Sequence, residues 1–503
     1  DGNTPAALEV LQGTYTPPPE CDPTLRDLLS HCKLPPNIPL EPSCPKSITT
    51  ECHQHGWKRA KEHTQAGLSG LSFAMMKADA LDPELAALDA SSRNIAYVSG
   101  FSYSRWKTGI NCMLIKNLKP GNFWVHKLRN VLLLECDFNM NNKKLSKDVM
   151  WAAELADALE RELYGGRKNH RSVEVSLNYR LVNDLLRQKR KAAILASTDA
   201  LGCFDCIVHS IAFLCLRCLG LPSAPIQSMI NTSQQMTHYI RTAFGDSDDS
   251  YGYDPSALLP LMGFLQGNGA AGTAWTSVIT VIVNMMKSAG FGLNMWSAIS
   301  GAVIKLVVLN FVDDTTLMCG GPTNYTSGRA IFNRMQPMLD YWESALRATG
   351  GTTSHEKSYW HLVDFYWEKE SWHYKKISHI PGELTLPQGP NRTPTPIQRL
   401  EVTEAKELLG LMIRPDGDET DQFNHLLAKA RKWQDAIRTN KINRHDAWYC
   451  LNNTIMKTLE YPLMATTLTR DQCKQLMSPV LEGGLPPSHV QKYMPRAIVR
   501  GSP

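Results

Sequence analysis

The chain has 503 residues, of which 43% are hydrophobic and 20% charged, the composition of an ordinary globular protein. These values exclude a chain too polar to bury a large core, and the length exceeds what one core usually supports, so we expect about two to four subdomains. The net charge of +5 is only mildly basic, which makes the distribution of charge more informative than its total.

Cysteine usage and hydropathy point to an intracellular protein outside the membrane. The 13 cysteines are an odd number, scattered without a secretory signal, which is typical of reduced thiols. The most apolar run, Ala270 to Met286, contains Asn284 and favours a buried helix over a membrane span. Because the chain starts at Asp1 and ends at Arg-Gly-Ser-Pro, we expect a slice of a longer protein.

The first 55 residues are rich in proline and lack helical periodicity, so we expect an extended or loosely ordered arm. Their cysteines and histidines are spaced too irregularly for a zinc site. A Gly/Ser turn at 67–72 then leads into a helix from Phe73 to about Ala80.

Residues 103–135 predict a hairpin with basic arms. Strand-like runs, Asn111 to Ile115 and Val131 to Leu134, flank the turn Lys119-Pro120-Gly121. Between Phe101 and Leu134 there is no Asp or Glu, and such a patch suits a polyanion. The basic residues used below are Lys116, Lys127 and Arg129.

Two helices and a strand are predicted next. The first helix is capped by Ser146 and runs to about Leu163, and the second is capped by Ser172, with basic residues at 187–191 that complement its dipole. Ala192 to Thr198 predicts a strand that ends at Asp199.

A helix from Asp205 to Leu219 follows, and the acidic stretch 245–252 predicts a surface turn. The glycine-rich segment Gln266 to Gly272 opens a long apolar helix that ends near Ser288. Cys203, Cys206, Cys215 and Cys218 mimic a zinc pattern, but along one continuous helix the outer pair would lie about 22 Å apart.

Two adjacent carboxylates, Asp313 and Asp314, follow an apolar run from Val303 to Val312 and precede a second run from Thr315. This pattern predicts a strand hairpin with paired acids at its tip. Neighbouring buried anions are costly unless cations meet them, and hard oxygen donors suit Mg²⁺. An ordinary solvated turn is the alternative for this stretch alone.

The remaining elements are predicted as a helix at 330–348, a turn at Gly350-Gly351, Lys357, and strands within 359–374. We expect a loop at 383–396 and a strand at Leu408–Ile413. Helices at 420–438 and about 444–459 complete the ordered part.

If the strand ending at Asp199 lies beside the hairpin, Asp199 and Asp313 point into one pocket. Two Mg²⁺ ions about 3.5–4 Å apart could then clamp the attacking and leaving oxygens at phosphorus. The basic arms would hold a triphosphate, since phosphoryl-type transfer needs mainly positioning and charge neutralisation.

This ordered set of motifs resembles reverse transcriptases of the non-LTR, LINE-like retroelement type, over residues 56 to about 440. Asp199 to Asp205 resembles motif A, in which Asp199 is a metal ligand and Phe204 is the steric gate against a ribose 2′-OH. Phe311 to Asp314 resembles motif C, which supplies two further metal ligands. Two Mg²⁺ ions are implied, with Mn²⁺ as a possible substitute.

The resemblance extends to the nucleotide-binding elements. Lys116, Lys127 and Arg129 match the fingertip strands that grip the incoming nucleotide, and 164–172 is similar to the GFRxGRS stretch of LINE-like and group II intron enzymes. Gln266-Gly267 looks like motif B, which packs against the template base and the nucleotide. Here Gly269-Ala-Ala-Gly272 replaces the usual Ser-Pro, and Arg129-Asn130 replaces the usual Arg-Pro.

Lys357 resembles the motif D lysine that protonates leaving pyrophosphate, and Leu409-Gly410 resembles the strand that grips the primer. The implied fold is an α+β right-hand polymerase. Its parts are an arm (1–55), fingers (56–190), a palm with an antiparallel sheet backed by helices (191–415), and a helical thumb (416–503). The implied partners are an RNA template, a DNA or RNA primer and deoxynucleoside triphosphates, without a membrane; the oligomeric state is left open.

Alternatives remain open at this stage. An RNA-dependent RNA polymerase also carries Asp-Asp, but usually after Gly and with a second Asp at the sugar-contact position. A catalytically silent nucleic-acid-binding relic is the other alternative. At single positions, Asp199 could cap a helix, Phe204 could be plain core, and Lys357, Lys127 and Arg129 could be solvated.

Overall fold

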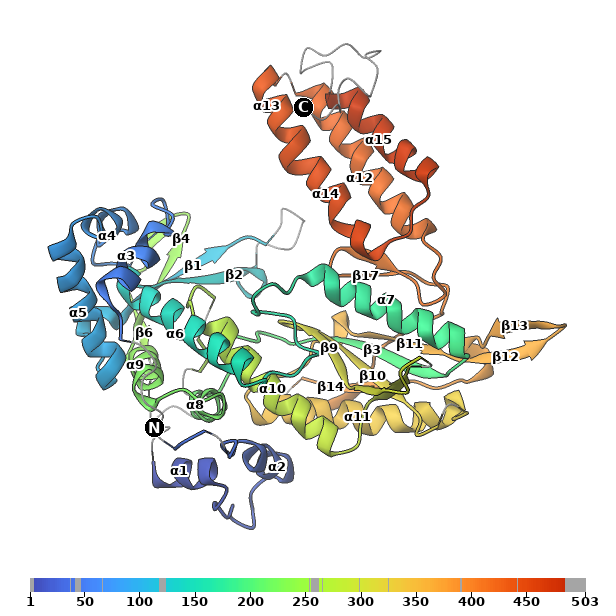
Figure 1. Ribbon diagram of the computed structural model, residues 1–503, viewed down its shortest axis with the longest axis horizontal. Helices are drawn as coiled ribbons and strands as arrows, with labels where there is room; N and C mark the ends of the chain where they lie inside the picture. Colours follow the sequence, from blue (N-terminus) through green and yellow to red (C-terminus); the bar gives the residue numbers. More distant parts are fainter. Residues whose placement is uncertain are drawn as a thin grey trace.

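The structure is a computed structural model with mixed α and β secondary structure, 48% helix and 18% strand, arranged in several sheets. It describes residues 4–36, 38–40, 47–65, 67–116, 124–252, 254, 262–264, 266–297, 299–323, 325–389, 391–440 and 442–484. A central sheet covered by helices, a second sheet to one side and a C-terminal helical unit are visible in Figure 1.

The central sheet has the order β16-β11-β3-β10-β9 and is built around β3. Every residue of β3 (Ala193–Asp199) is buried, as expected for an apolar run covered on both faces. β10 and β11 pair antiparallel to β3, β9 pairs antiparallel to β10, and β16 pairs parallel to β11. The other strands are β9 (Val308–Phe311), β10 (Asp314–Gly320), β11 (Tyr359–Val363) and β16 (Gln398–Leu400).

Helices cover the two faces of this sheet, and the strand alternation decides which side chains each helix meets. Ile194 and Ala196 of β3 share one core with α8 (His209–Cys218), α10 (Ala271–Ser288) and α11 (Gly328–Ala348). Ala193 and Leu195 face the opposite way, into a second core completed by α7 (Ser172–Lys189). Figure 1 shows α7 above the sheet and α10 and α11 below it.

The second sheet contains the predicted basic hairpin. β1 (Thr108–Leu114) and β2 (Arg129–Leu133) pair antiparallel, and the turn at 119–121 lies outside the described residues. β4 (Thr237–Thr242) joins parallel to β1, although it follows β3 in the chain, and the short strands β5 (Gly245–Asp246) and β6 (Tyr251–Gly252) pair with β4. The neighbouring helices are α4 (Phe73–Asp79), α5 (Pro83–Ser99), α6 (Cys136–Leu155) and α9 (Ser223–Gln234).

The expectation of a loosely ordered arm is wrong for the described N-terminal residues. They form α1 (Pro5–Gln12), α2 (Pro23–His31) and α3 (Thr50–Lys58), which are capped by the side chains of Thr4, Asp22 and Thr49. Proline is well tolerated at the first helical position, where its missing N–H costs nothing. Helices this short show little periodicity, and α2 is held by packing on α10 and α11, with Leu28 fully buried.

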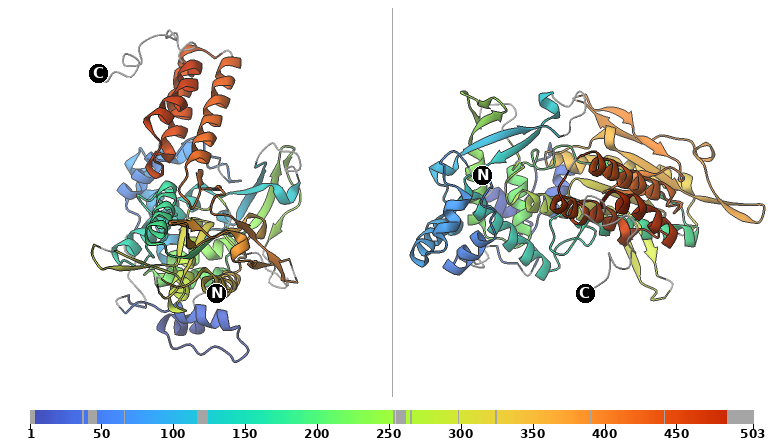
Figure 2. Two further views of the ribbon diagram at one scale, coloured as in Figure 1. Left: turned by 90° about the vertical axis from the view of Figure 1, so that its right-hand side faces the viewer. Right: turned by 90° about the horizontal axis from the view of Figure 1, so that it is seen from above.

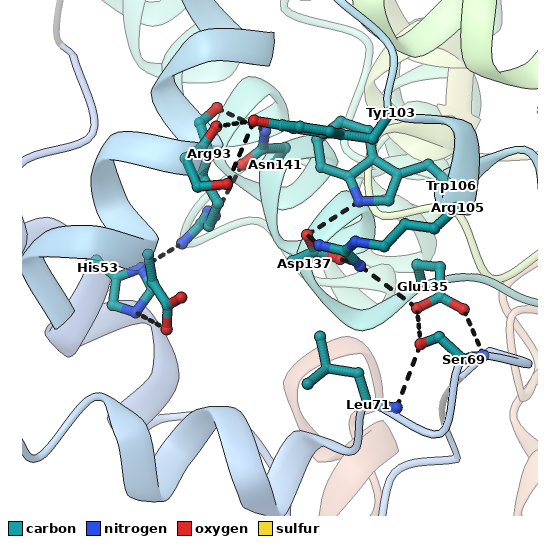
Figure 3. A network of polar contacts seen from close by, with 12 residues as sticks. His53, Ser69, Leu71, Arg93, Tyr103, Arg105, Trp106, Glu135, Asp137 and Asn141 are labelled. Carbon is teal, nitrogen blue, oxygen red and sulfur yellow. Dashed lines mark hydrogen bonds and ion pairs between the residues drawn. The ribbon is translucent and has the colours of Figure 1, made fainter. Parts of the chain in front are cut away.

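A buried polar network ties the N-terminal helices to the second sheet (Figure 3). Arg93 of α5 donates to Asn141 Oδ1 at 2.9 Å and contacts His53 Nδ1 at 3.2 Å. Arg105, just before β1, forms a bidentate pair with Asp137 of α6, whose Oδ2 also accepts a hydrogen bond from Trp106 Nε1. The base of the β1–β2 hairpin is therefore fixed to α6 by paired charges.

Segment 67–72 is fastened to the same helix end. The Ser69 N–H and hydroxyl donate to the two carboxylate oxygens of Glu135 at 3.1 and 2.5 Å (Figure 3). Gly67 lies so close that a Cβ there would meet Glu135 Oε1 at 2.3 Å, which explains the glycine.

The C-terminal helical unit has a core of its own, which includes Leu426, Leu451, Ile455 and Val480. The two predicted helices are confirmed, but the expectation that they complete the ordered part is wrong, because a further helix follows them. Figure 2 shows the unit rising above the rest of the molecule. Its elements are α12 (Thr420–Thr439), α13 (Arg444–Cys450), a π-helical turn (Leu451–Ile455), α14 (Met456–Glu460) and α15 (Arg470–Gly484).

Several predicted boundaries are wrong, and tight turns explain most of them. Leu408–Ile413 is a hairpin of β17 (Lys406–Leu408) and β18 (Leu411–Ile413), because Leu409 and Gly410 both take positive φ. The loop predicted at 383–396 contains a hairpin of β14 (Thr385–Gln388) and β15 (Thr393–Pro396).

Other corrections concern where elements begin. The helix predicted from Ser146 begins at Cys136 and ends at Leu155. The helix predicted from Asp205 is α8, which begins only at His209 because residues 201–206 form turns. The single strand predicted from Val303 is divided, since β8 (Val303–Leu306) pairs with β7 (Leu293–Trp296) outside the central sheet. β12 (Phe365–Glu368) and β13 (Ser371–Tyr374) form another hairpin.

Within the described residues, no helix is long and apolar enough to cross a membrane.

The buried histidines should each make a contribution that lowers the stability of the folded state in mild acid. Burial lowers the pKa of His53, His238 and His361 to about 4, with the charge of Arg93 contributing at His53. The unfolded chain takes up protons below about pH 6.5 while these folded-state imidazoles do not, so stability falls from pH 6.5 towards pH 4, by about 1–3 kcal/mol for each histidine.

His238 offers a test, because its Nδ1 accepts from Asn111 Nδ2 at 3.2 Å and Asn could replace that acceptor. The free energy of unfolding of His238→Asn, measured against urea from pH 8 to pH 5, should fall less than that of the unaltered protein. Equal pH dependence of the two proteins would contradict the assignment.

Candidate active site

The candidate site lies where β3 ends beside the start of β10. In the antiparallel register Asp199 stands directly opposite Asp314, so the two side chains project from the same face of the sheet. Two residues back on β3, Ser197 Oγ lies 3.1 Å from Thr316 Oγ1 on that face. The face is thus apolar under α7 and becomes polar and anionic towards the end of the strand.

Asp313 lies at the tip of the hairpin and is held there by a strained turn. Only Val312 and Asp313 connect the paired residues Phe311 and Asp314, and Val312 has φ +60°. Two-residue hairpins need positive φ, which is costly for a β-branched residue and is usually supplied by glycine. The Val312 carbonyl accepts hydrogen bonds from Trp275 Nε1 at 2.6 Å and from Asn310 Nδ2 at 2.9 Å.

A glycine packs against this turn from the other side. A Cβ at Gly165 would come within 2.5 Å of the Val312 nitrogen. The preceding residues run along β9, where the Asn310 N–H donates to the Glu162 carbonyl and the Tyr164 N–H donates to the Asn310 carbonyl, both at 3.0 Å. The turn that carries Asp313 is therefore clamped between α10 and the segment 162–165.

Sequence reasoning missed these clamping residues. Gly165 fell within a stretch matched to a family motif, but nothing indicated that it contacts Val312. Trp275 and Asn310 gave no signal, because an apolar helix and a buried strand commonly contain such residues.

Lys357 reaches the same cluster from the residues preceding β11. It ends a short 3₁₀ turn (His355–Lys357), and its Nζ lies 2.6 Å from Asp199 Oδ2. The lysine side chain is 63% exposed, whereas that of Asp199 is 12% exposed. Partial burial opposes protonation, but the hydrogen bond to Asp199 and the charges of Asp313 and Asp314 raise the pKa of Lys357.

Asp313 and Asp314 hold a proton more readily than isolated carboxyl groups do. Burial, and then the charge of Asp199, raises the pKa of Asp313, while Lys357 and Arg129 act in the opposite direction. Burial and the charges of Asp313 and Asp199 raise the pKa of Asp314 to about 6. Such like-charge repulsion is the electrostatic mark of a site that favours an added cation.

One of the three predicted residues of the basic hairpin acts on this site. The charge of Arg129, at the start of β2, lowers the pKa of Asp313. Lys116, just after β1, acts instead on Asp205 in the turn after β3, where burial raises the pKa and the charge of Lys116 opposes that rise. Lys127 is exposed in a 3₁₀ turn (Val125–Lys127), and the structure gives it no contact with the carboxylates.

Gln266 and Gly267 connect the second sheet to the central body. The Leu132 N–H of β2 donates to the Gln266 carbonyl at 2.6 Å, and Asn139 Nδ2 of α6 donates to the Gly267 carbonyl at 2.9 Å. Gly267 has φ +119°, and a Cβ there would lie 2.1 Å from the Leu132 carbonyl oxygen, so only glycine fits.

Phe204 lies in the turn after β3, half-buried and packed against the main core, with its carbonyl accepting from the Phe264 N–H at 2.8 Å. The packing that the structure records for the Phe204 side chain is with the core, and the ring is linked to the carboxylates by its place in the turn that follows Asp199.

The carboxylates suit a hard divalent cation that is completed by other oxygen donors. Among the described residues, no group of three His, Cys, Asp or Glu side chains could hold an ion by itself. Mg²⁺ is commonly held by one or two carboxylates with waters and substrate phosphates rather than by an all-protein cage. Asp199 and the 313/314 pair fit that partial donor set.

The comparisons add no relative: no family model matches the chain, and no curated protein matches it.

Removing one charge from the cluster should stabilise the fold. Asp314→Asn keeps the side-chain shape and removes the repulsion with Asp199 and Asp313, so the free energy of unfolding at pH 8 without divalent cations should rise by about 1 kcal/mol. Urea titration measures this change. Asp435→Asn, an exposed matched control on α12, should change it by less than about 0.5 kcal/mol. A lower stability of Asp314→Asn would contradict the electrostatic account.

Proposed function

We propose that the chain is a template-directed nucleotidyltransferase of the reverse transcriptase type, which joins deoxynucleotides to a primer 3′-OH on an RNA template. The observation that carries this proposal is the convergence of Asp199, Asp313 and Asp314 at one end of a buried sheet. Asp199 is more than a hundred positions away from the 313/314 pair in the chain, so a solvated Asp-Asp turn does not account for their arrangement.

The chain's own residues would do most of the work by positioning charge. Mg²⁺, held by Asp199 and Asp313 with Asp314 beside them, would lower the pKa of the primer hydroxyl and offset charge on the departing pyrophosphate. The protonated amine of Lys357 lies next to Asp199 Oδ2, and its side chain is exposed enough to turn towards the leaving phosphate. There the amine would donate a proton. Lys116 and Arg129 would bind the triphosphate from the opposite side.

The wider arrangement supports a right-hand polymerase. The second sheet would serve as fingers, the central sheet as palm and the C-terminal helical unit as thumb. The β17–β18 hairpin is tied to the thumb by Tyr461 Oη, which donates to the Leu409 carbonyl at 2.8 Å, as a primer-gripping element would need. Gln266-Gly267, fixed between fingers and palm, would border the base pair that forms.

Phe204 supports DNA synthesis over RNA synthesis. A bulky ring next to the site would collide with a ribose 2′-OH, whereas an RNA polymerase needs a polar group there.

Asp313→Ala should abolish primer extension while leaving the protein folded. Loss of a metal-binding carboxylate should lower the rate by about 10³-fold or more, since several kcal/mol of charge stabilisation disappear. The measurement is extension of a labelled DNA primer on RNA and DNA templates with each nucleotide type. Asp248→Ala, in the exposed acidic turn, is the matched control, and thermal melting checks folding. Substantial residual synthesis by the Asp313 variant would refute the proposal.

Phe204→Val should admit ribonucleotides. Shortening the ring opens space for a 2′-OH, so the ratio of ribonucleotide to deoxynucleotide incorporation should rise by about tenfold or more. The ratio is internal to each protein, so partial unfolding of the variant does not affect it. Leu201→Val, in the same turn and exposed, should leave the ratio unchanged. Unaltered sugar selectivity in the Phe204 variant would assign that ring to the core.

A further inference from the structure

A group of exposed tryptophans and cations lies at the end of the central sheet remote from the carboxylates. Trp296, Trp367 and Trp372 are 50%, 57% and 47% exposed, and they lie beside the exposed residues Lys189 and Arg190 at the C-terminal end of α7. We call these five residues the aromatic–basic surface. Several exposed indoles gathered at one place are typical of a binding surface.

Each cation of this surface stands over an aromatic ring. Lys189 Nζ lies 5.6 Å from the centre of the Trp296 ring. The Arg190 guanidinium lies 5.9 Å from the Trp372 ring and 5.4 Å from Phe365, which is buried in the core under α7. Trp372 pairs directly with Trp367 across the hairpin, with ring centres 5.2 Å apart and planes at 71°.

The hairpin that carries two of the tryptophans is costly to maintain. β12 and β13 pair only with each other and project from the edge of the molecule in Figure 1, and a two-stranded hairpin is marginal by itself. Its turn residues, Lys369 and Glu370, have φ +46° and +61°, where glycine or asparagine would be unstrained. Strain retained in an exposed element favours a functional role.

We propose that the aromatic–basic surface binds single-stranded nucleic acid, with bases stacked on the indoles and phosphates neutralised by Lys189 and Arg190. Alternation of rings and cations is the pattern that non-specific single-strand binders use. Glu368 lies on the opposite face of the hairpin from Trp367, by strand alternation, and therefore does not oppose the phosphates.

This proposal rests on the proposed polymerase function for its partner, but the surface is distinct from the carboxylate site. Tyr359 pairs with Ser197 near Asp199, and Trp367 follows eight residues later, at most about 26 Å away at 3.3 Å per residue. At 3.4 Å per nucleotide that distance corresponds to about eight nucleotides. A strand of about eight nucleotides or fewer would therefore connect this surface to the carboxylates.

The test compares tryptophan replacements in the full chain by fluorescence anisotropy with labelled poly(U) and poly(dT) of about 20 nucleotides, without nucleotides or divalent cations. Trp367→Leu/Trp372→Leu, which keeps apolar volume but loses the flat rings, should weaken binding by about tenfold or more. Trp367→Phe/Trp372→Phe should retain most of the affinity, and Arg190→Glu should also weaken binding and lower its salt dependence. The two oligonucleotides distinguish RNA from DNA as the preferred strand.

Trp151→Leu, at an exposed tryptophan on α6, is the matched control and should bind as the unaltered protein does. Equal affinity of the Leu double variant and the unaltered protein would overturn the proposal, as would equal loss in the Trp151 control. Self-association that disappears in the double variant while oligonucleotide affinity persists would identify a copy–copy interface and also overturn it. Because binding is read without catalysis, absence of primer extension would count against the proposed function and not against this surface.

Discussion

The register between β3 and β10 is the constraint on which the candidate site depends. It places Asp199 opposite Asp314 on the face of the sheet that α7 covers farther along. A slip of one residue would turn Asp314 and every other side chain of β10 to the opposite face. Such a slip is prevented because both faces of the strand pair are packed into separate apolar cores, so the same burial that stabilises the fold also fixes the carboxylates together.

This arrangement has an electrostatic and conformational cost that neighbouring groups offset in part. Burial and mutual repulsion raise the pKa values of Asp313 and Asp314, while Lys357 and Arg129 act against that rise. The positive φ of Val312 is maintained by hydrogen bonds from α10 and β9 and by the space that Gly165 leaves. A strained backbone next to a cluster of like-charged side chains is typical of functional sites.

The sequence predicted the elements whose signals are local. The apolar run before Asp199, the Asp-Asp hairpin and the long helix after Gln266 were recognisable from hydrophobic pattern and turn residues. The helices α1 and α2 were missed because they are short and proline-led, and their stability comes from packing on α10 and α11. The pairing of β4 with β1 and the contact of Trp275 with Val312 were also beyond prediction, since both join residues far apart in the chain.

The central claim is that Asp199 and the 313/314 pair bind the same divalent cation. Anomalous X-ray scattering from crystals of the chain grown with Mn²⁺, a primer–template and a deoxynucleoside triphosphate tests it most directly. We expect an anomalous peak in contact with carboxylate oxygens of both Asp199 and Asp313, with Lys357 displaced from Asp199 Oδ2. A Mn²⁺ peak elsewhere, with the Lys357–Asp199 ion pair intact and the triphosphate away from these residues, would contradict the account.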